Sequence, residues 1–152
     1  MRTRPLVEGD LDACADLFVA VFNKEPWNDC WTVQLAIDYF RDVYNTPGFH
    51  GFVIEAEAEP PENFPRIIGF IIGTRKRWWS GDIFYLYEMC VDEAYQGKGI
   101  GKQLMSDTKM GLIEKGYTAI VLLTERIFPA AHFYEKHGFI ESTDTRFYFC
   151  SL

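Results

Sequence analysis

Small and apolar residues recur every three or four positions in four parts of the chain, which is the spacing of an amphipathic helix. These parts contain Leu11, Ala15, Phe18 and Phe22; Ile37, Phe40 and Tyr44; Leu104, Thr108 and Leu112; and the segment PAAHFYEKHG at residues 129–138. Thr32 suits the N-cap of the second helix, and the sequence NTPG ends that helix. The pattern therefore predicts four helices.

Runs of β-branched and aromatic residues, bounded by turn-forming sequence, predict the strands. We expect strands near residues 3–6, at 51–57, 66–77, 82–91 and 118–125, and two short ones around 139–142 and 146–150. The three consecutive strands in the middle of the chain suggest an antiparallel meander, and the run TAIVLLTE reads as a buried strand. The order of the elements predicts a mixed α/β sheet with helices on its faces.

The composition fits one compact domain spanning residues 1–152, because 48% of the residues are apolar and 24% are charged. No stretch reaches the ~18 apolar residues that span a bilayer, and the opening MRTRPLVEGD lacks the apolar run of a signal peptide. We therefore expect a cytoplasmic protein without a membrane partner. The segment Glu55–Arg66, where prolines and carboxylates cluster, reads as a loop inside the domain.

The charge balance narrows the class of partner. A net charge of -7 repels polyanions, which argues against nucleic acid and favours a cationic small molecule. The cysteines are far apart and have no histidine at metal-ligand spacing, so we expect reduced, buried thiols and no metal site. They are Cys14, Cys30, Cys90 and Cys150.

The stretch VDEAYQGKGIGKQLM, from Val91 to Met105, has three glycines at alternate positions and then turns into helical sequence. Two nucleotide-binding patterns fail on spacing. The third glycine of a dinucleotide fingerprint falls on Lys102 or Leu104, and a P-loop would need glycine and a hydroxyl residue where Gln96 and Gln103 stand. What remains is a loop of bare backbone amides that opens onto a helix N-terminus, which is an anion cradle.

Lys98 and Lys102 add positive charge to this loop, so a pyrophosphate is a natural ligand even on an acidic protein. The alternative is a glycine-rich turn with two solvated lysines. Local sequence leaves both interpretations open.

The hexapeptide QGKGIG, Gln96 to Gly101, has the form Q/R-x-x-G-x-G/A and resembles the acetyl-coenzyme A motif of the GNAT acetyltransferase superfamily. The later segment AAHFYEKHGF resembles the A-x-x-F-Y-x-x-x-G-F segment of the same family, and the order of elements is similar along nearly the whole chain. The resemblance implies an α/β, GNAT-like fold: a mixed, mostly antiparallel central sheet of six to seven strands with helices on both faces.

The resemblance also implies acetyl-CoA as the cosubstrate, with the glycine loop holding its pyrophosphate and the preceding strand pairing with its pantetheine amides. The cofactor-binding residues that it implies are Met89, Cys90, Val91, Gln96, Gly97, Lys98, Gly99, Ile100, Gly101, Lys102 and Tyr134. The strand at 118–125 is expected to splay away to admit the cofactor. One position departs from the family, because Ile127 stands where many members carry an asparagine that contacts the coenzyme.

Acetyl transfer to an amine needs a general base that removes a proton from the ammonium group and a general acid that protonates the leaving thiolate. Glu88 is the candidate base, since strand alternation puts it on the face of Leu86 and Cys90 and an apolar setting would raise its pKa. The alternative is a strand glutamate paired with an Arg or Lys. Tyr134 matches the family tyrosine that protonates the coenzyme thiolate, although an aromatic residue of a short helix also serves as core.

Other groups near this chemistry rank lower. His132 and His137 are rivals as proton handlers, but a helical histidine near the surface is usually solvated. A strand amide at Met89 or Cys90 would meet the oxyanion. Cys90 lacks an adjacent base, so we expect direct attack in a ternary complex and no cysteine acyl-intermediate.

The loop KEPWNDCWT between the first two helices is the candidate acceptor site. Trp27, Asp29 and Trp31 offer aromatic faces and a carboxylate, which suit a cation, and Glu88 would complete the site. The segment TRKRWWSGD could form a second wall, and the alternative is that these tryptophans cover the core beside helix ends. The region VFNKEPWNDCWT resembles some aminoglycoside 6'-N-acetyltransferases, and a polyamine, a metabolite amine or a protein N-terminus would fit the same residues.

The sequence thus predicts an acetyl-CoA-dependent N-acetyltransferase that acts on a primary amine of a small, cationic acceptor. The alternatives are acetylation of a protein or peptide amine and a non-catalytic acetyl-CoA or CoA sensor module. A homodimer is expected from the family and from the apolar segment RFYFC, which would need cover.

Overall fold

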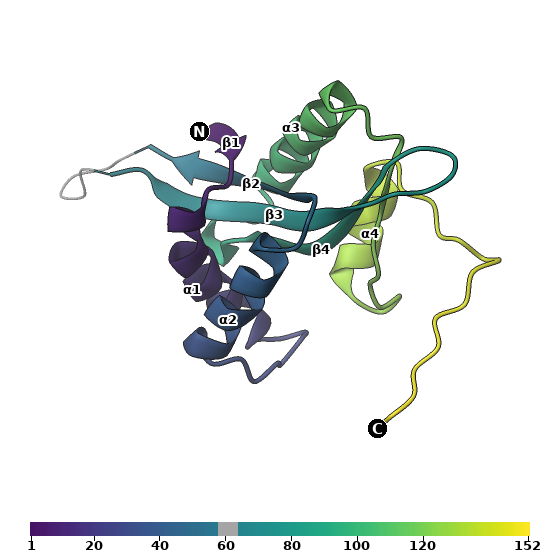
Figure 1. The fold of residues 1–152 in the computed structure, drawn as a ribbon. Coiled ribbons are helices and arrows are strands. Elements are labelled where there is room, and N and C mark those ends of the chain that lie inside the picture. Colours follow the sequence, from purple (N-terminus) through teal and green to yellow (C-terminus); the bar gives the residue numbers. More distant parts are fainter. Residues whose placement is uncertain (58–63) are drawn as a thin grey trace. The chain divides into compact units, whose positions relative to one another are not determined.

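The computed structural model describes residues 1–57 and 64–152, so part of the predicted loop Glu55–Arg66, at 58–63, lies outside the described residues. Helices and strands follow one another in the order shown in Figure 1. They are β1 (Arg2–Pro5), η1 (Glu8–Asp10), α1 (Leu11–Phe22), α2 (Val33–Tyr44), β2 (Phe49–Ala56), β3 (Arg66–Lys76), β4 (Ile83–Val91), η2 (Glu93–Tyr95), α3 (Ile100–Glu114), β5 (Ala119–Val121) and α4 (Pro129–Lys136). The chain divides into two compact units, Met1–Leu122 and Leu123–Leu152.

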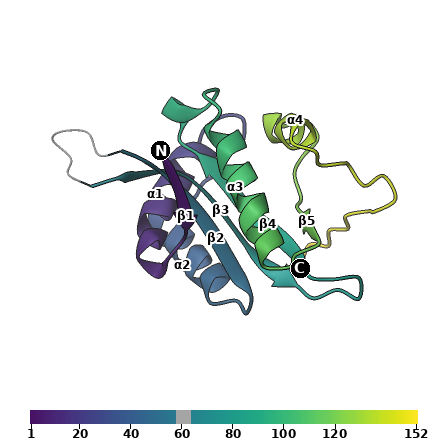
Figure 2. The same ribbon diagram turned by 90° about the horizontal axis from the view of Figure 1, so that it is seen from above.

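The first unit is built on one sheet of five strands in the order β1-β2-β3-β4-β5 (Figure 2). Neighbouring strands from β1 to β4 run antiparallel, and β5 pairs parallel to β4. This confirms the mixed, mostly antiparallel sheet and the central meander that the sequence predicts.

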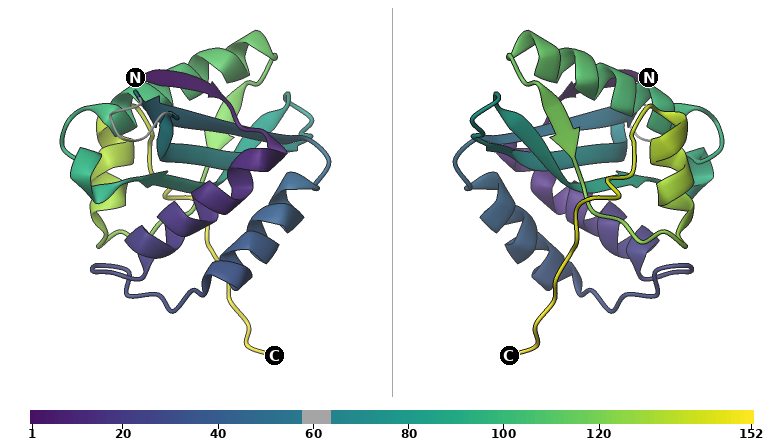
Figure 3. Two further views of the ribbon diagram at one scale, coloured as in Figure 1. Left: turned by 90° about the vertical axis from the view of Figure 1, so that its left-hand side faces the viewer. Right: turned by 90° about the vertical axis from the view of Figure 1, so that its right-hand side faces the viewer.

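Helices cover both faces of this sheet, α1 and α2 on one side and α3 on the other (Figure 3). On the first side, Phe18 of α1 and Phe40 of α2 are buried against Phe70 of β3, with the rings of Phe40 and Phe70 5.4 Å apart at 73°. On the second side, α3 lies so close to the sheet that a Cβ on Gly111 would stand 2.9 Å from the Phe52 ring. The sheet thus separates two apolar layers.

The local signals for the helices are confirmed. Thr32 is the N-cap of α2, because its Oγ1 accepts a hydrogen bond from the Leu35 N–H at 3.1 Å. On α1, the predicted stripe is buried at Leu11, Ala15 and Phe18. Within the described residues, none of the helices is both long enough and apolar enough to cross a membrane.

The predicted count of six to seven strands is wrong, because the two strands expected around 139–142 and 146–150 do not form. In the second unit, all of whose residues the structure describes, α4 is followed by irregular chain. Ile140, Phe147 and Phe149 are exposed. A strand needs a neighbour for its backbone hydrogen bonds, so a high β propensity without such a neighbour does not make one.

Two further expectations need correction. The strand expected over residues 118–125 is only the three residues of β5, and Ala119 and Val121 are exposed rather than buried. All four cysteines are free as expected, but Cys30 and Cys150 are exposed. Neither of these two cysteines belongs to the apolar face of a helix or to a paired strand, and those are the elements that form the core.

Candidate active site

A β-bulge in β4 sets the direction of Glu88. Ile72 of β3 pairs with Glu88, whereas Gly73 pairs with Leu86, so Tyr87 is an extra residue on β4. The bulge puts Leu86 and Glu88 on opposite faces of the sheet, which corrects the expectation that they share one. Glu88 does share a face with Cys90, whose sulfur is 3.9 Å from the Leu17 carbonyl oxygen of α1.

Glu88 is half-buried under α2, and its carboxylate has a partner there. The Tyr39 hydroxyl donates a hydrogen bond to Glu88 Oε1 at 2.9 Å. Burial raises the pKa of Glu88 to about 7; the Tyr39 hydrogen bond opposes this rise, and the negative charge of Asp29 adds to it. The alternative of a strand glutamate paired with an Arg or Lys is not what the described residues show. A carboxyl group with such a pKa can accept and release a proton near neutral pH.

Asp29 and Trp31 lie near this carboxylate, because the charge of Asp29 acts on Glu88 and Trp31 contacts Tyr39. Trp31 stacks on Tyr39, with ring centroids 5.6 Å apart and an interplanar angle of 22°. The Trp31 indole Nε1 donates to Asp29 Oδ2 at 3.1 Å. The group formed by Asp29, Trp31, Tyr39 and Glu88, which we call the acidic aromatic cluster, combines two carboxylates with an aromatic wall, and such a wall suits a cation.

The tryptophans outside this cluster have other surroundings. Trp27 packs against Phe22, with ring centroids 4.9 Å apart, so it helps to cover the core at the end of α1. Trp78 and Trp79 lie in the hairpin between β3 and β4, where the Lys76 ammonium sits 4.6 Å from the Trp78 ring centroid. Trp79 is 90% exposed.

The glycine loop leads into α3 with its backbone in conformations that only glycine adopts readily. Gly97 has φ of 70°, and Gly99, the N-cap of α3, has φ of 83°. A Cβ on either residue would meet nothing within 4 Å, so the space beside the loop is open. No side chain caps the first turn of α3, a segment that the structure describes completely, so its amides are available to an anion.

Side chains support this loop from outside the open space. Gln96 Nε2 donates to the Val91 carbonyl oxygen at 2.9 Å, which ties the loop to the end of β4. The Lys98 ammonium lies 5.6 Å from the Tyr95 ring centroid. Lys98, within the loop, and Lys102, directly after it, are both exposed. The residues present therefore fit the phosphate groups of a coenzyme A ligand.

The edge of β4 that follows the bulge is open. Strand β5 pairs only with Ile83–Tyr85, and among the described residues no strand pairs with the rest of this edge. This agrees with the expected splaying of the two strands. The Asp92 N–H donates to the Ile68 carbonyl oxygen of β3, so by alternation Cys90 also bonds to β3, while Met89 and Val91 present their amides to the open edge.

Tyr134 belongs to α4 in the second unit. Its ring is half-buried and packs edge-on against Phe139, with ring centroids 5.3 Å apart. The two histidines of this helix have local partners: His132 Nδ1 is 3.9 Å from Glu135 Oε2, and His137 Nδ1 is 2.6 Å from the Phe133 carbonyl oxygen. Glu88 thus belongs to the first unit and Tyr134 to the second.

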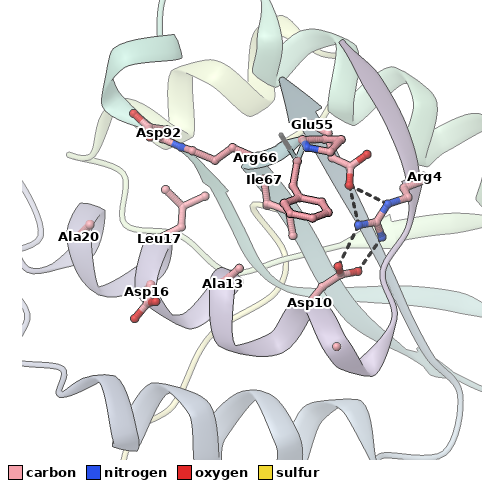
Figure 4. Close-up of a pocket in the computed structure, with 13 residues that line it drawn as sticks. Arg4, Asp10, Ala13, Asp16, Leu17, Ala20, Glu55, Arg66, Ile67 and Asp92 are labelled. Carbon is pink, nitrogen blue, oxygen red and sulfur yellow. Dashed lines mark hydrogen bonds and ion pairs between the residues drawn. The ribbon is translucent and has the colours of Figure 1, made fainter. Parts of the chain in front are cut away.

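A groove of about 700 Å³ lies between α1 and the sheet (Figure 4), and its lining residues include none of the predicted site residues. Among its charged side chains, Arg4 binds Asp10 and Glu55, with shortest distances of 2.7 and 2.6 Å, and Arg66 binds Asp92. Paired charges of this kind stabilise the fold. Among the described residues, no group of three or more His, Cys, Asp and Glu side chains is arranged to hold a metal ion.

Sequence reasoning missed Tyr39 and the bulge at Tyr87. Tyr39 stands beside Phe40 at the margin of the α2 stripe, and a tyrosine in that place usually finds a hydrogen-bond partner for its hydroxyl. The position of Tyr39 in the helix pattern could therefore have identified it as a candidate site residue. The bulge has no local signal, because it depends on how β3 and β4 pair.

Residues 47–141 match the family model of the acetyltransferase (GNAT) domain. No curated protein matches the chain significantly. Among solved structures, the chain is similar to an aminoglycoside acetyltransferase from an uncultured soil metagenomic sample, in complex with sisomicin, at 22% identity and a TM-score of 0.71, over 99% of this chain and 96% of that one.

Two further solved structures are similar along their length. An acetyltransferase of Trypanosoma brucei has 21% identity and a TM-score of 0.69, over 99% of both chains. A possible acetyltransferase of Clostridium difficile has 17% identity and a TM-score of 0.80, over 99% of this chain and 97% of that one. At these identities the likeness is one of fold.

Proposed function

The chain belongs to the acetyltransferase (GNAT) family, and on that premise we propose that it moves an acetyl group from acetyl-CoA to a primary amine of a small, cationic acceptor. One observation carries the proposal about the acceptor. The half-buried Glu88, with a pKa of about 7, lies within a cluster of aromatic rings and a second carboxylate. Such a setting attracts an ammonium group and can remove its proton.

Acetyl-CoA, the cosubstrate of this family, supplies the acetyl group as a thioester when it is bound. We assign its pyrophosphate to the amides from Gly97 to Gly101 and to the start of α3, with Lys98 and Lys102 adding positive charge. The open edge of β4, at Met89 and Val91, is suited to pair with the pantetheine amides. The open space beside Gly97 and Gly99 supports this assignment.

In the proposed reaction, Glu88 takes a proton from the acceptor ammonium, directly or through water. The N–C bond forms as the C–S bond breaks in a ternary complex. The Met89 N–H, which alternation directs to the open edge, is the proposed donor to the carbonyl oxygen. Tyr134 gives its hydroxyl proton to the leaving sulfur and regains one from the second proton that the nitrogen loses. One proton leaves through Glu88 in each turnover.

Asp29 and Trp31 are the proposed acceptor-binding residues, and Trp27 supports their loop from the core side. An aminoglycoside is one candidate acceptor, suggested by the similarity in fold to an aminoglycoside acetyltransferase. Polyamines and peptide amines suit the same two carboxylates. A single domain, a cytoplasmic location, a homodimer and the lack of nucleic acid and membrane partners stay predictions from the sequence.

The test is thiol release from acetyl-CoA over a panel of aminoglycosides, polyamines and short peptides, with calorimetric titration of CoA on the same sample. We expect turnover with one class of amine and micromolar CoA binding. Tight CoA binding without turnover for any amine would favour the non-catalytic sensor module. Turnover restricted to peptides would instead support acetylation of a protein amine.

A further inference from the structure

We propose that Tyr39 is a positioning residue: its hydroxyl holds Glu88 Oε1 and leaves Oε2 to take the proton from the acceptor. This inference rests on the proposed function, since it concerns how the base is held. Sequence motifs do not point to Tyr39. The two residues are 49 positions apart in the chain, and they meet because α2 covers the face of the sheet to which Glu88 is turned (Figure 3).

The ring of Tyr39 is fixed by its neighbours. It stacks on Trp31 and also packs against Phe40 and Phe18, with ring centroids 5.5 and 6.4 Å away. Phe40 is buried completely. A ring held by three others has little freedom to turn, so the direction of its hydroxyl is set by the packing of α1 and α2.

The carboxylate is fixed from the other side. The bulge at Tyr87 turns Glu88 toward α2, and pairing with Ile72 holds the backbone at that point. Within the part of the chain that the structure describes, the side-chain hydrogen bond of Glu88 is the one from Tyr39 to Oε1. Oε2 is therefore the oxygen available to the acceptor or to a bridging water.

The charges around this pair make the hydroxyl a permanent donor. Burial and the charge of Glu88 raise the pKa of Tyr39 well above its ordinary value, so the phenol stays protonated at every working pH. Besides Tyr39, the titratable groups that face Glu88 or this pair are Asp29, Tyr85, Tyr87 and Cys90. The hydrogen bond from Tyr39 favours the charged form of Glu88, whereas burial and the negative charge of Asp29 disfavour it.

The decisive variant is Tyr39→Phe, which keeps the ring and removes the hydroxyl. We expect the acid limb of the pH profile of kcat/KM to move up by about one pH unit. The Glu88 carboxylate loses a hydrogen-bond donor, and a tenfold rise in its proton affinity corresponds to one pKa unit. At pH 7 the rate should fall about fivefold, the loss should approach tenfold at lower pH, and it should shrink as pH rises. The KM for acetyl-CoA should stay as in the unchanged protein. Tyr44→Phe is the matched control, since Tyr44 lies on the same helix and packs on Phe49.

A second measurement does not depend on turnover. Carboxyl ¹³C NMR titration gives the pKa of Glu88 directly, with Glu88→Gln used to assign its signal. A higher Glu88 pKa in Tyr39→Phe than in Tyr44→Phe supports the proposal. If the pKa and the acid limb both stay in place, or the rate falls equally at every pH, Tyr39 has only a packing role and the proposal is wrong. If no amine is acetylated while the pKa still shifts, the positioning stands and the proposed acceptor chemistry fails.

Discussion

Two carboxylates of the first unit are both partly or fully shielded from water and yet differ in pKa. Asp10 is 8% exposed and binds Arg4 with both oxygens, at 2.7 and 2.9 Å. Glu88 is half-buried and binds the neutral hydroxyl of Tyr39. Burial raises the pKa of both groups, but hydrogen bonds from Arg4 and from the Val7 N–H bring that of Asp10 below its ordinary value, whereas that of Glu88 reaches about 7.

The charge of the hydrogen-bond donor explains this difference. A guanidinium offsets the cost of burying a carboxylate, so the pair at Asp10 is ionised at all physiological pH values and serves the fold. A phenol supplies one hydrogen bond and no charge, and the nearby Asp29 adds repulsion. Glu88 is therefore held where it can exchange a proton, at a cost in stability.

The largest expected effect is on activity, from Glu88→Gln. We expect kcat/KM at pH 7.5 to fall about 10²- to 10⁴-fold, the range for loss of a general base. Asp10→Asn serves as the matched control and should keep its kcat/KM per folded molecule. Initial rates of thiol release with the best amine of the panel measure both variants. Comparable loss in both would show that the two carboxylates do not differ in role.

The next effect is on stability, from Asp10→Asn. We expect the free energy of unfolding at pH 7 to fall by about 2 kcal/mol, because Arg4 loses a charged partner in a partly buried place. The pKa of Asp10 is lowered on folding, so its contribution is present above the ordinary value of 3.8 and is lost as pH falls through the folded pKa. Urea unfolding at pH 7 and pH 3 checks this. A difference that stayed equal at both pH values would argue against the ion pair as its cause.

The first unit also shows which structural features can be predicted from a sequence. Gly97, Gly99 and the Thr32 cap were predictable because each depends on a few adjacent residues whose backbone or side-chain chemistry has few alternatives. Glu88 was predictable as a candidate because a motif and a strand pattern agreed on it. The face of the sheet on which the Glu88 side chain lies was not predictable, because the bulge at Tyr87 depends on how β4 pairs with β3.

Contacts between distant segments were missed for the same reason. Arg4 and Glu55 are 51 positions apart, and no local pattern tells that they meet across β1 and β2. The opposite error occurred at residues 146–150, where strand propensity was read without a strand to pair with. Propensity describes the segment alone, whereas pairing depends on the rest of the fold.

The smallest effect sharpens the comparison most, because it has the opposite sign from Asp10→Asn. The pKa of Glu88 is raised on folding from 4.5 to about 7, so its contribution to stability is fully present below pH 4.5 and is lost as pH rises through 7. Gln keeps an oxygen for the Tyr39 hydroxyl and cannot ionise. We therefore expect Glu88→Gln to unfold with a free energy about 1 kcal/mol higher than the unchanged protein at pH 8, below the limit of about 3 kcal/mol that the full pKa shift would allow. At pH 5 the two proteins should be nearly equal in urea unfolding. A variant that is less stable than the unchanged protein at pH 8 would mean that the Glu88 carboxylate stabilises the fold, as Asp10 does, and the contrast between the two sites would not hold.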